Sequence, residues 1–510
     1  MRTAIALGIV ALATVLSVVF AAREQDLIKD LPGWDGDNVM YAGLMEVEPK
    51  YGSNMFYWLT LADEEPENKP VVLWLTGGPG CSGLLGLMSE MGPFFAGPDN
   101  KLLPNPWGWN TLANMIYIES PIGVGFSYSH NTSRYNVGDQ QTAEVSYAFL
   151  LEFFAAYPEL AENDFYITGE SYGGHYTVNL SAYILKMQKQ AAAGSPAFPN
   201  SFKGMAVGNA WTDAPLDNMG CVLDWDSHTI ISEDVAKGLL ATCDFAHIGP
   251  FAAAEGVDPA ACNKYYNEAM TQMGDITIYN IYWPVCLSSS EITGQGHALY
   301  RALAQGPETD SAAQLGRVMD KLITMQQRKL ADAAAAAAAV GPAPPPYDPA
   351  PVCVSNYLTA YLNDPAVQAA IHAPKLPYAW SGCSSIVKYS YPDLLASVVP
   401  KYLDDLFPAN IRVRVYSGDV DGIVPTPGTK LWIDTMNLTV ATGGDFRSWT
   451  DPFNQVGGWT TTYENGHGGE FMFSTVRNAG HEVPEYQGPR AWTYIKAFLD
   501  GTDLPAPTKP

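Results

Sequence analysis

Residues 165 to 176 read Phe165-Tyr166-Ile167-Thr168-Gly169-Glu170-Ser171-Tyr172-Gly173-Gly174-His175-Tyr176 and join a β-rich segment to a helical one. The pattern Gly-x-Ser-x-Gly between a strand and a helix is typical of a nucleophile elbow, a strained turn that exposes its serine. Gly169 and Gly173 leave room there for neighbouring backbone. The run from 176 to 189 has apolar residues at helical spacing. We therefore predict that Ser171 is a nucleophile; the alternative is an ordinary turn whose serine caps the helix.

Strand-like and helical segments alternate around this stretch. Residues 70–75 and 114–120 are nearly continuous apolar runs, the pattern of strands buried on both faces of a parallel sheet. A helical pattern over 142–157 leads into the elbow, and further strands are expected at 411–417 and 470–476. This order predicts an α/β protein with a central, mostly parallel sheet and the α/β-hydrolase fold.

The alternation breaks between residues 213 and 374. Helical patterns there carry closely spaced cysteines, and we interpret the segment as a largely helical cap inserted into a core formed by 23–212 and 375–510. Within the cap, the Ala- and Pro-rich segment 328–351 has little apolar surface to bury. We expect it to be a surface linker and a site of proteolytic nicking.

The first 22 residues have the layout of a secretory signal peptide, with a basic start, an apolar run and small residues before the expected cleavage site. A signal anchor is the alternative. Cleavage would leave a protein with no membrane segment in the lumen of the secretory pathway or outside the cell. The seven cysteines fit three disulfides and one odd thiol in such a compartment. Of the three glycosylation sequons, at Asn131, Asn179 and Asn437, we expect Asn179 to be unmodified because it lies in the predicted helix.

The composition and charge of the chain limit the kinds of partner that it can bind. The 510-residue chain is 47% hydrophobic, which is enough for a large core, and carries a formal net charge of -25 with a sequence pI near 4.5. Such a surface repels nucleic acid and anionic membranes. Partial protonation in an acidic compartment would relieve the self-repulsion, so a lysosome-like or vacuolar lumen or an acidic secretion suits this chain.

A glycine cluster follows the apolar run at 70–75. It reads Thr76-Gly77-Gly78-Pro79-Gly80-Cys81-Ser82-Gly83 and lacks the lysine of a phosphate-binding loop. We interpret it as a loop that turns backbone N–H groups toward a developing negative charge. A plain strand-to-helix connection is the alternative.

A serine nucleophile needs a histidine base and an acid that orients the base. In α/β-hydrolases the acid and then the histidine follow late strands, which favours His481 after the strand at 470–476. His175 lies on the helix after Ser171 and is expected to pack there. Asp419 and Asp421 both follow the strand ending at residue 417, and chain order alone does not choose between them.

Four motifs together resemble the serine carboxypeptidase family, which includes yeast and cereal carboxypeptidases and cathepsin A. They are Trp74-Leu75-Thr76-Gly77-Gly78-Pro79-Gly80-Cys81-Ser82, Gly169-Glu170-Ser171-Tyr172-Gly173-Gly174-His175-Tyr176, Ser417-Gly418-Asp419-Val420-Asp421 and Gly480-His481-Glu482-Val483-Pro484. The resemblance implies Asp421 as the acid, and it implies the N–H groups of Gly78 and Tyr172 as the oxyanion hole.

The resemblance also implies a site for the terminal carboxylate of a peptide. It would comprise Trp74, Thr76, the Gly77 backbone, Glu90 and Glu170. Two glutamates beside a carboxylate must share protons with it, so peptide binding is expected to be best at acidic pH. Many peptidases of the family carry Asn where this chain has Thr76. Members that transfer acyl groups can carry Thr there, but they tend to lose features that this chain keeps at Glu170 and after His481.

The sequence therefore predicts a serine-type carboxypeptidase that acts on peptides with a free C-terminus and needs no metal or organic cofactor. Glu482 is expected to help accept basic leaving residues. The implied disulfides are Cys81 with Cys383, Cys243 with Cys262 and Cys286 with Cys353, which leaves Cys221 as the odd thiol. A homodimer is a possible assembly. The alternatives are a secreted acyltransferase or esterase and, from another class, a lumenal binding partner that stabilises other hydrolases.

Overall fold

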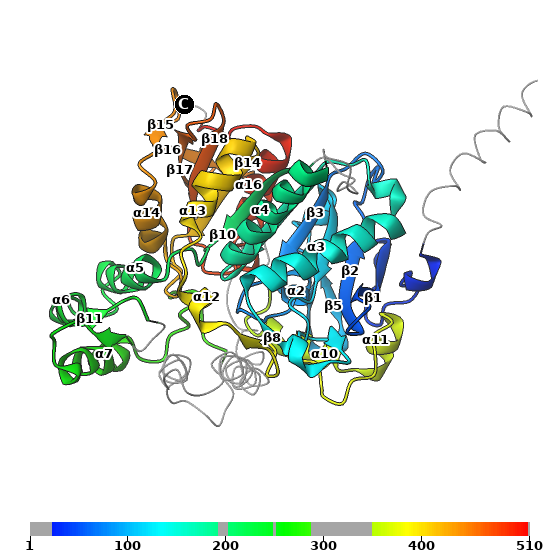
Figure 1. The fold of residues 1–510 in the computed structure, drawn as a ribbon, viewed down its shortest axis with the longest axis horizontal. Coiled ribbons are helices and arrows are strands. Elements are labelled where there is room, and N and C mark those ends of the chain that lie inside the picture. Colours follow the sequence, from blue (N-terminus) through cyan, green and yellow to red (C-terminus); the bar gives the residue numbers. More distant parts are fainter. Residues whose placement is uncertain (1–22, 192–201, 248–250, 287–348, 508–510) are drawn as a thin grey trace, which may run out of the picture.

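A computed structural model describes residues 23–191, 202–247, 251–286 and 349–507 (Figure 1). The predicted signal peptide and nearly all of the Ala- and Pro-rich segment 328–351 lie outside the described residues. In the described part of the chain, no helix is long and apolar enough to cross a membrane.

One twelve-stranded sheet organises the described chain. Its main strands run in the order β1 (Met40–Glu48), β2 (Ser53–Thr60), β6 (Asn114–Ile118), β3 (Val71–Leu75), β9 (Phe165–Glu170), β10 (Phe202–Gly208), β14 (Arg412–Gly418), β18 (Glu470–Val476), β17 (Val456–Glu464) and β15 (Thr439–Val440). The six strands from β6 to β18 are parallel, and antiparallel strands flank them on both sides. The carboxyl ends of β3, β9, β10, β14 and β18 therefore meet at one edge of the sheet.

Both faces of the sheet are covered by helices, which explains the continuous apolar runs in its central strands. Val71, Leu73 and Leu75 of β3 belong to the core beneath α3 (Asp139–Ala156), α4 (Gly173–Ala191) and α14 (Thr426–Thr435). The alternate residues Val72 and Trp74 belong to the opposite core, which also contains residues of α16 (Gly488–Asp500). In Figure 1, α3 and α4 cross the near face of the sheet.

A small helical lobe stands beside the sheet (Figure 1). It consists of α5 (Ala214–Ser227), α6 (Glu233–Thr242) and α7 (Pro259–Met273), and these helices enclose a hydrophobic cluster of their own. By contrast, α10 (Val354–Leu362) and α11 (Pro365–Ala370) pack into the core of the main body. Both helices lie within the predicted cap at 213–374, so we propose that the cap proper is the lobe of α5 to α7.

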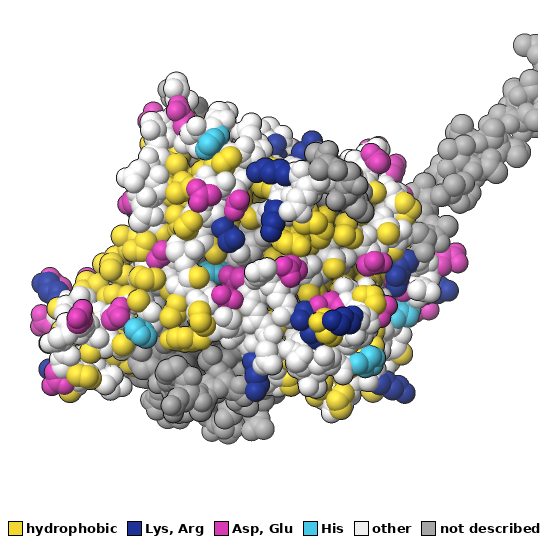
Figure 2. Space-filling view, in the orientation of Figure 1, with side chains coloured by type: hydrophobic (Ala, Val, Ile, Leu, Met, Phe, Trp, Pro, Cys, Tyr) yellow, Lys and Arg dark blue, Asp and Glu magenta, His cyan; other side chains and the backbone are white. Residues whose placement is uncertain are grey.

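Three disulfides join described cysteines, and they pair Cys81 with Cys383, Cys243 with Cys262 and Cys286 with Cys353. Cys221 is buried and lies outside these three disulfides, and its thiol donates to Ile423 O over 3.2 Å. On the face shown in Figure 2, acidic and basic side chains are interspersed among apolar ones.

Candidate active site

Ser171 lies on a strained turn between β9 and α4. Its φ is 61°, in the left-handed region that few non-glycine residues adopt, and such strain marks functional positions. The turn is held because Ser171 N donates to Gly208 O over 3.2 Å and Trp211 N donates to Ser171 O over 2.9 Å. A Cβ atom at Gly173 would lie 2.5 Å from Leu75 O, so the elbow needs glycine there.

The glycine-rich loop after β3 lies directly against this elbow. A Cβ atom at Gly77 would be 2.3 Å from Tyr172 N and 2.8 Å from Ser171 Cβ. The loop is fixed on its other side because Gly80 N donates to the Tyr176 hydroxyl over 3.1 Å. The Gly78 backbone and the N–H of Tyr172, the two predicted oxyanion donors, thus come from adjacent loops beside the serine.

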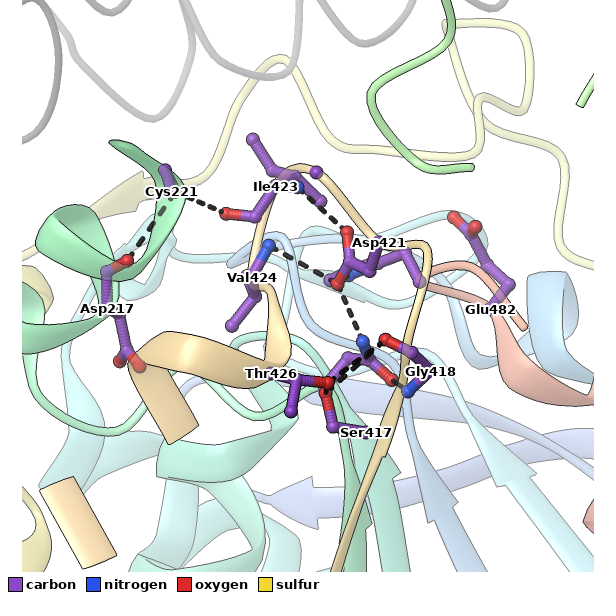
Figure 3. Close-up of polar contacts among 12 residues, drawn as sticks. Asp217, Cys221, Ser417, Gly418, Asp421, Ile423, Val424, Thr426 and Glu482 are labelled. Atoms are coloured by element: carbon purple, nitrogen blue, oxygen red, sulfur yellow. Dashed lines mark hydrogen bonds and ion pairs between the residues drawn. The ribbon is translucent and has the colours of Figure 1, made fainter. Parts of the chain in front are cut away.

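Asp421 and His481 follow β14 and β18 and are hydrogen bonded, with 2.8 Å between Asp421 Oδ2 and His481 Nδ1. Because a carboxylate only accepts, Nδ1 carries the proton and Nε2 is left to act as a base. Asp421 is buried and is held by further donors: Asn209 Nδ2 at 2.7 Å, Ile423 N at 2.8 Å and Val424 N at 3.3 Å. Figure 3 shows the last two contacts in the loop after β14. Asp421 is therefore built to orient the imidazole.

The other candidates for these roles are engaged elsewhere. Asp419 accepts a hydrogen bond from Asn478 N at 2.5 Å, and His175 is bonded through Nδ1 to Asp139 at 2.8 Å. The described residues include no group of three or more His, Cys, Asp or Glu side chains that could hold a metal ion.

His481 is enclosed by a segment of the chain that follows α7. The backbone N–H of His481 donates to Tyr279 O over 2.6 Å. The Tyr279 ring packs edge-on against the imidazole with 5.3 Å between ring centroids. Burial lowers the pKa of His481. The charge of Asp421, the hydrogen bond to it and the charges of Glu482 and Glu90 together outweigh burial and raise that pKa above its ordinary value.

Glu90 and Glu170 form a buried, hydrogen-bonded carboxyl pair next to the elbow. Glu90 ends the short helical turn η2 (Gly86–Glu90), and Glu170 is the last residue of β9. Burial raises the pKa of Glu90 to about 8, and burial together with the neighbouring Glu90 charge raises the pKa of Glu170 well above its usual range. The pair thus retains at least one proton at neutral pH, and a carboxyl that keeps its proton can donate to a substrate carboxylate.

Three more predicted binding residues, Trp74, Thr76 and Glu482, have defined hydrogen-bond partners. Trp74 Nε1 donates to Thr76 Oγ1 over 2.8 Å, which leaves the threonine hydroxyl proton free to point elsewhere. Glu482 follows His481, and its Oε2 accepts from the Tyr486 hydroxyl over 3.2 Å. Burial is the main reason why the pKa of Glu482 is raised.

Sequence analysis missed three residues of this site. Asn209, with a φ of 41°, bridges the acid loop because its Nδ2 donates to Asp421 and its Oδ1 accepts from Gly418 N at 2.9 Å. Its position directly after a strand of the parallel sheet was the available signal. Glu485, on the short helix α15 (Val483–Tyr486), is a buried fourth carboxyl, and neighbouring Glu482 adds to the effect of burial in raising its pKa. Tyr279 comes from an irregular segment and gave no signal.

The parallel sheet, the strand-to-helix turn at Ser171 and the hydrogen-bonded Asp421–His481 pair after later strands place the chain in the α/β-hydrolase class. The serine carboxypeptidase family matches residues 32–501, and this chain belongs to that family.

Comparison with individual proteins agrees with this assignment. The chain is 36% identical over 489 residues to serine carboxypeptidase-like 25 of Arabidopsis thaliana, covering 94% of this chain and 93% of that protein. It is 34% identical over 491 residues to serine carboxypeptidase 24 of the same plant, covering 95% and 94%. Among solved structures, it resembles Kex1(delta)p, a prohormone-processing carboxypeptidase from Saccharomyces cerevisiae, with a TM-score of 0.68, 18% identity and coverage of 94% of this chain and 97% of that one.

Proposed function

We propose that this protein is a serine-type carboxypeptidase that releases C-terminal residues from peptides and proteins on the acidic side of neutrality. The observation that carries the proposal is the buried Glu90–Glu170 pair directly beside the Ser171 elbow. A hydrolase that cuts anywhere along a chain has no use for a protonated carboxyl pair next to its nucleophile. An enzyme that must bind a terminal carboxylate does, because each shared proton becomes a hydrogen bond to the substrate.

The chemistry assigned to the three catalytic residues proceeds by acyl transfer. Ser171 Oγ attacks the last peptide carbonyl while His481 Nε2 takes its proton, and Asp421 stabilises the imidazolium. The N–H groups of Gly78 and Tyr172 bind the oxyanion of the tetrahedral intermediate. His481 then protonates the leaving amine, and water, deprotonated by the same histidine, hydrolyses the acyl-enzyme.

The binding residues divide into two groups. Trp74, Thr76, the Gly77 backbone, Glu90 and Glu170 receive the terminal carboxylate, with the Thr76 hydroxyl oriented by its bond from Trp74. Glu482 lies next to the base and faces the side chain of the leaving residue. Its carboxyl would accept Lys or Arg there while hydrophobic residues remain tolerated.

A secreted acyltransferase or esterase of the same family is the second candidate, and Thr76 is the observation that favours it. Threonine has a shorter reach than the Asn of many family peptidases, which would weaken binding of a terminal carboxylate. The retained Glu170 and Glu482 support the peptidase instead.

We place the enzyme in the secretory pathway, in a lysosome-like or vacuolar lumen or outside the cell, because its three disulfides need an oxidising compartment and its raised carboxyl pKa values suit an acidic one. The first test is release of the last amino acid from an N-blocked dipeptide at pH 5. Wild-type protein should release it, and Ser171→Ala should not. Equal release by both proteins would refute the proposal.

A further inference from the structure

A partly buried carboxylate, that of Asp139, contacts residues that follow Ser171 in the elbow and in α4. Asp139, the first residue of α3, accepts four side-chain hydrogen bonds. Its Oδ1 accepts from the hydroxyls of Tyr172 at 3.0 Å and Tyr389 at 2.7 Å, and its Oδ2 accepts from His175 Nδ1 at 2.8 Å and Asn179 Nδ2 at 3.1 Å. No step of the proposed reaction uses any of these side chains.

Tyr172 joins this cluster to the reaction. Its backbone N–H is a proposed oxyanion donor, while its side chain is buried among the cluster. The Tyr172 ring stacks on His175 with 4.5 Å between centroids and an interplanar angle of 20°, and Tyr389 packs edge-on against it at 5.2 Å. One residue therefore offers its N–H to the site and is held at its far end by Asp139.

His175 depends on Asp139 for its orientation. Its ring is fully buried, and Nε2 makes no hydrogen bond to the residues that the structure describes. Nδ1 is therefore the ring atom through which polar contacts fix the imidazole, and the imidazole is the surface on which the Tyr172 ring stacks.

The same cluster reaches the glycine-rich loop. Tyr176 packs edge-on against Tyr172 at 5.3 Å and accepts a hydrogen bond from Gly80 N, two residues after Gly78. Both backbone segments that supply the proposed oxyanion donors are thus attached to side chains ordered around Asp139.

We infer that Asp139 is a positioning residue of the oxyanion hole, which acts by holding Tyr172 and His175 at the start of α4 against the start of α3. The inference rests on the proposed function, because it presumes that the Tyr172 N–H binds the oxyanion. Donors aimed at the oxyanion act mainly in the transition state, so a small displacement lowers kcat more than it raises KM.

The test compares Asp139→Asn, Tyr172→Phe and the double variant. Rates are normalised to the number of sites that react with a fluorophosphonate, so that misfolded molecules do not count. Tyr57→Phe is the matched control, because Tyr57 donates to buried Asp26 over 2.6 Å in the same way but lies on β2 away from the elbow. Each variant is assayed for hydrolysis of the blocked dipeptide, for inhibition by an N-blocked amino aldehyde, which forms a hemiacetal oxyanion on the serine, and for inhibition by the blocked amino acid product.

We expect Asp139→Asn to lower kcat about tenfold or more and Tyr172→Phe about threefold or more, with KM within about threefold of wild type. The kcat of the double variant should equal that of Asp139→Asn within about twofold, because both changes break the hydrogen bond between Tyr172 and Asp139. Inhibition by the aldehyde should weaken in step with kcat/KM while product inhibition stays constant, and Tyr57→Phe should change none of these values.

Unchanged kcat per reactive site in both single variants, or aldehyde inhibition as strong as in wild type, would overturn the inference and leave the carboxypeptidase proposal standing. Additive losses in the double variant would also overturn it. If wild-type protein hydrolysed no dipeptide at all, the proposed function would fail and the inference with it.

Discussion

Glu90 and Glu170 are hydrogen bonded to each other in the interior of the protein, although both side chains would be carboxylates in water. Two carboxyls form such a contact only when a proton lies between them. The contact therefore makes the protonation state of the pair, and with it the binding of a terminal carboxylate, depend on pH.

Binding of free-acid peptides should weaken as the pH rises. Burial raises the pKa of Glu90 to about 8 and that of Glu170 further. Below these pKa values the protonated pair donates a hydrogen bond to the substrate carboxylate, and above them the ionised pair repels that carboxylate. KM for a blocked dipeptide should therefore rise by up to about tenfold per pH unit above pH 8. KM for the C-terminal amide of the same dipeptide should stay flat. Parallel KM profiles for acid and amide would exclude this role of the pair.

For both substrates kcat should fall at low pH, because protonated His481 cannot accept the serine proton.

Removing the charge that orients His481 should stop the reaction. Asp421→Asn should lower kcat by about 10⁴-fold, because an amide in place of Oδ2 favours the wrong imidazole tautomer. Asp419→Asn is the matched control and should stay within about threefold of wild type, since Asp419 bonds to Asn478 N and not to the histidine. Equal losses in the two variants, measured on sites that react with a fluorophosphonate, would show that Asp421 has no special role.

Glu482 should set the preference for basic leaving residues. Glu482→Gln removes its charge and keeps its size, so the ratio of kcat/KM for a C-terminal Arg substrate to that for a Leu substrate should fall about threefold to tenfold. Glu464→Gln, at an exposed position on β17, should leave the ratio unchanged. An unaltered ratio in Glu482→Gln would remove this residue from the specificity pocket.

The fold should be more stable in acid than at slightly alkaline pH, partly because of Asp217 (Figure 3). Burial raises the pKa of Asp217 to about 8, and its Oδ2 accepts from the N–H groups of Thr212 and Asp213. Because the folded state holds this proton more tightly than the unfolded chain, the stabilisation is greatest at low pH and is lost as the pH rises through about 8. Between pH 5 and 8 the loss amounts to as much as about 4 kcal/mol.

Asp217→Asn keeps the acceptor oxygen and removes the titration. The difference in Tm between pH 5 and 8 should therefore shrink in Asp217→Asn compared with wild type, whereas Asp404→Asn, at an exposed position, should behave like wild type. A pH dependence that is equally steep in all three proteins would contradict the assignment.

Much of the fold could be predicted from the sequence because the central strands are apolar on both faces of the sheet. Val71 to Leu75 form a continuous apolar run, and the structure buries every one of them, on alternate faces of the sheet. Helices cover both faces, so neither face requires polar residues. The strand-to-helix turn at Ser171 was equally readable because Gly173 has no alternative where a Cβ atom would meet Leu75 O.

The remaining site residues could not be assigned from sequence patterns alone because their roles depend on contacts between distant segments. Chain order left Asp419 and Asp421 equivalent, and the resemblance to the family favoured Asp421. In the structure the loop after β14 separates them, because Asp421 is hydrogen bonded to His481 and Asp419 to Asn478. Asn209 and Asp139 also escaped sequence analysis, because their roles depend on partners from distant segments, and a polar residue after a strand or at the start of a helix does not identify those partners.

The central claim is that a free C-terminal carboxylate defines the substrate. We would measure kcat/KM at pH 5 for three substrates: an N-blocked dipeptide with a free C-terminal acid, the C-terminal amide of the same dipeptide, and the methyl ester of an N-acyl amino acid. Ser171→Ala serves as the blank. We expect the free acid to be cleaved about 100-fold or more faster than the amide, which is the discrimination available when a buried charged partner goes unpaired. Cleavage or acyl transfer from the ester with no activity on the free acid would contradict the account and assign the protein to the acyltransferase or esterase branch of its family.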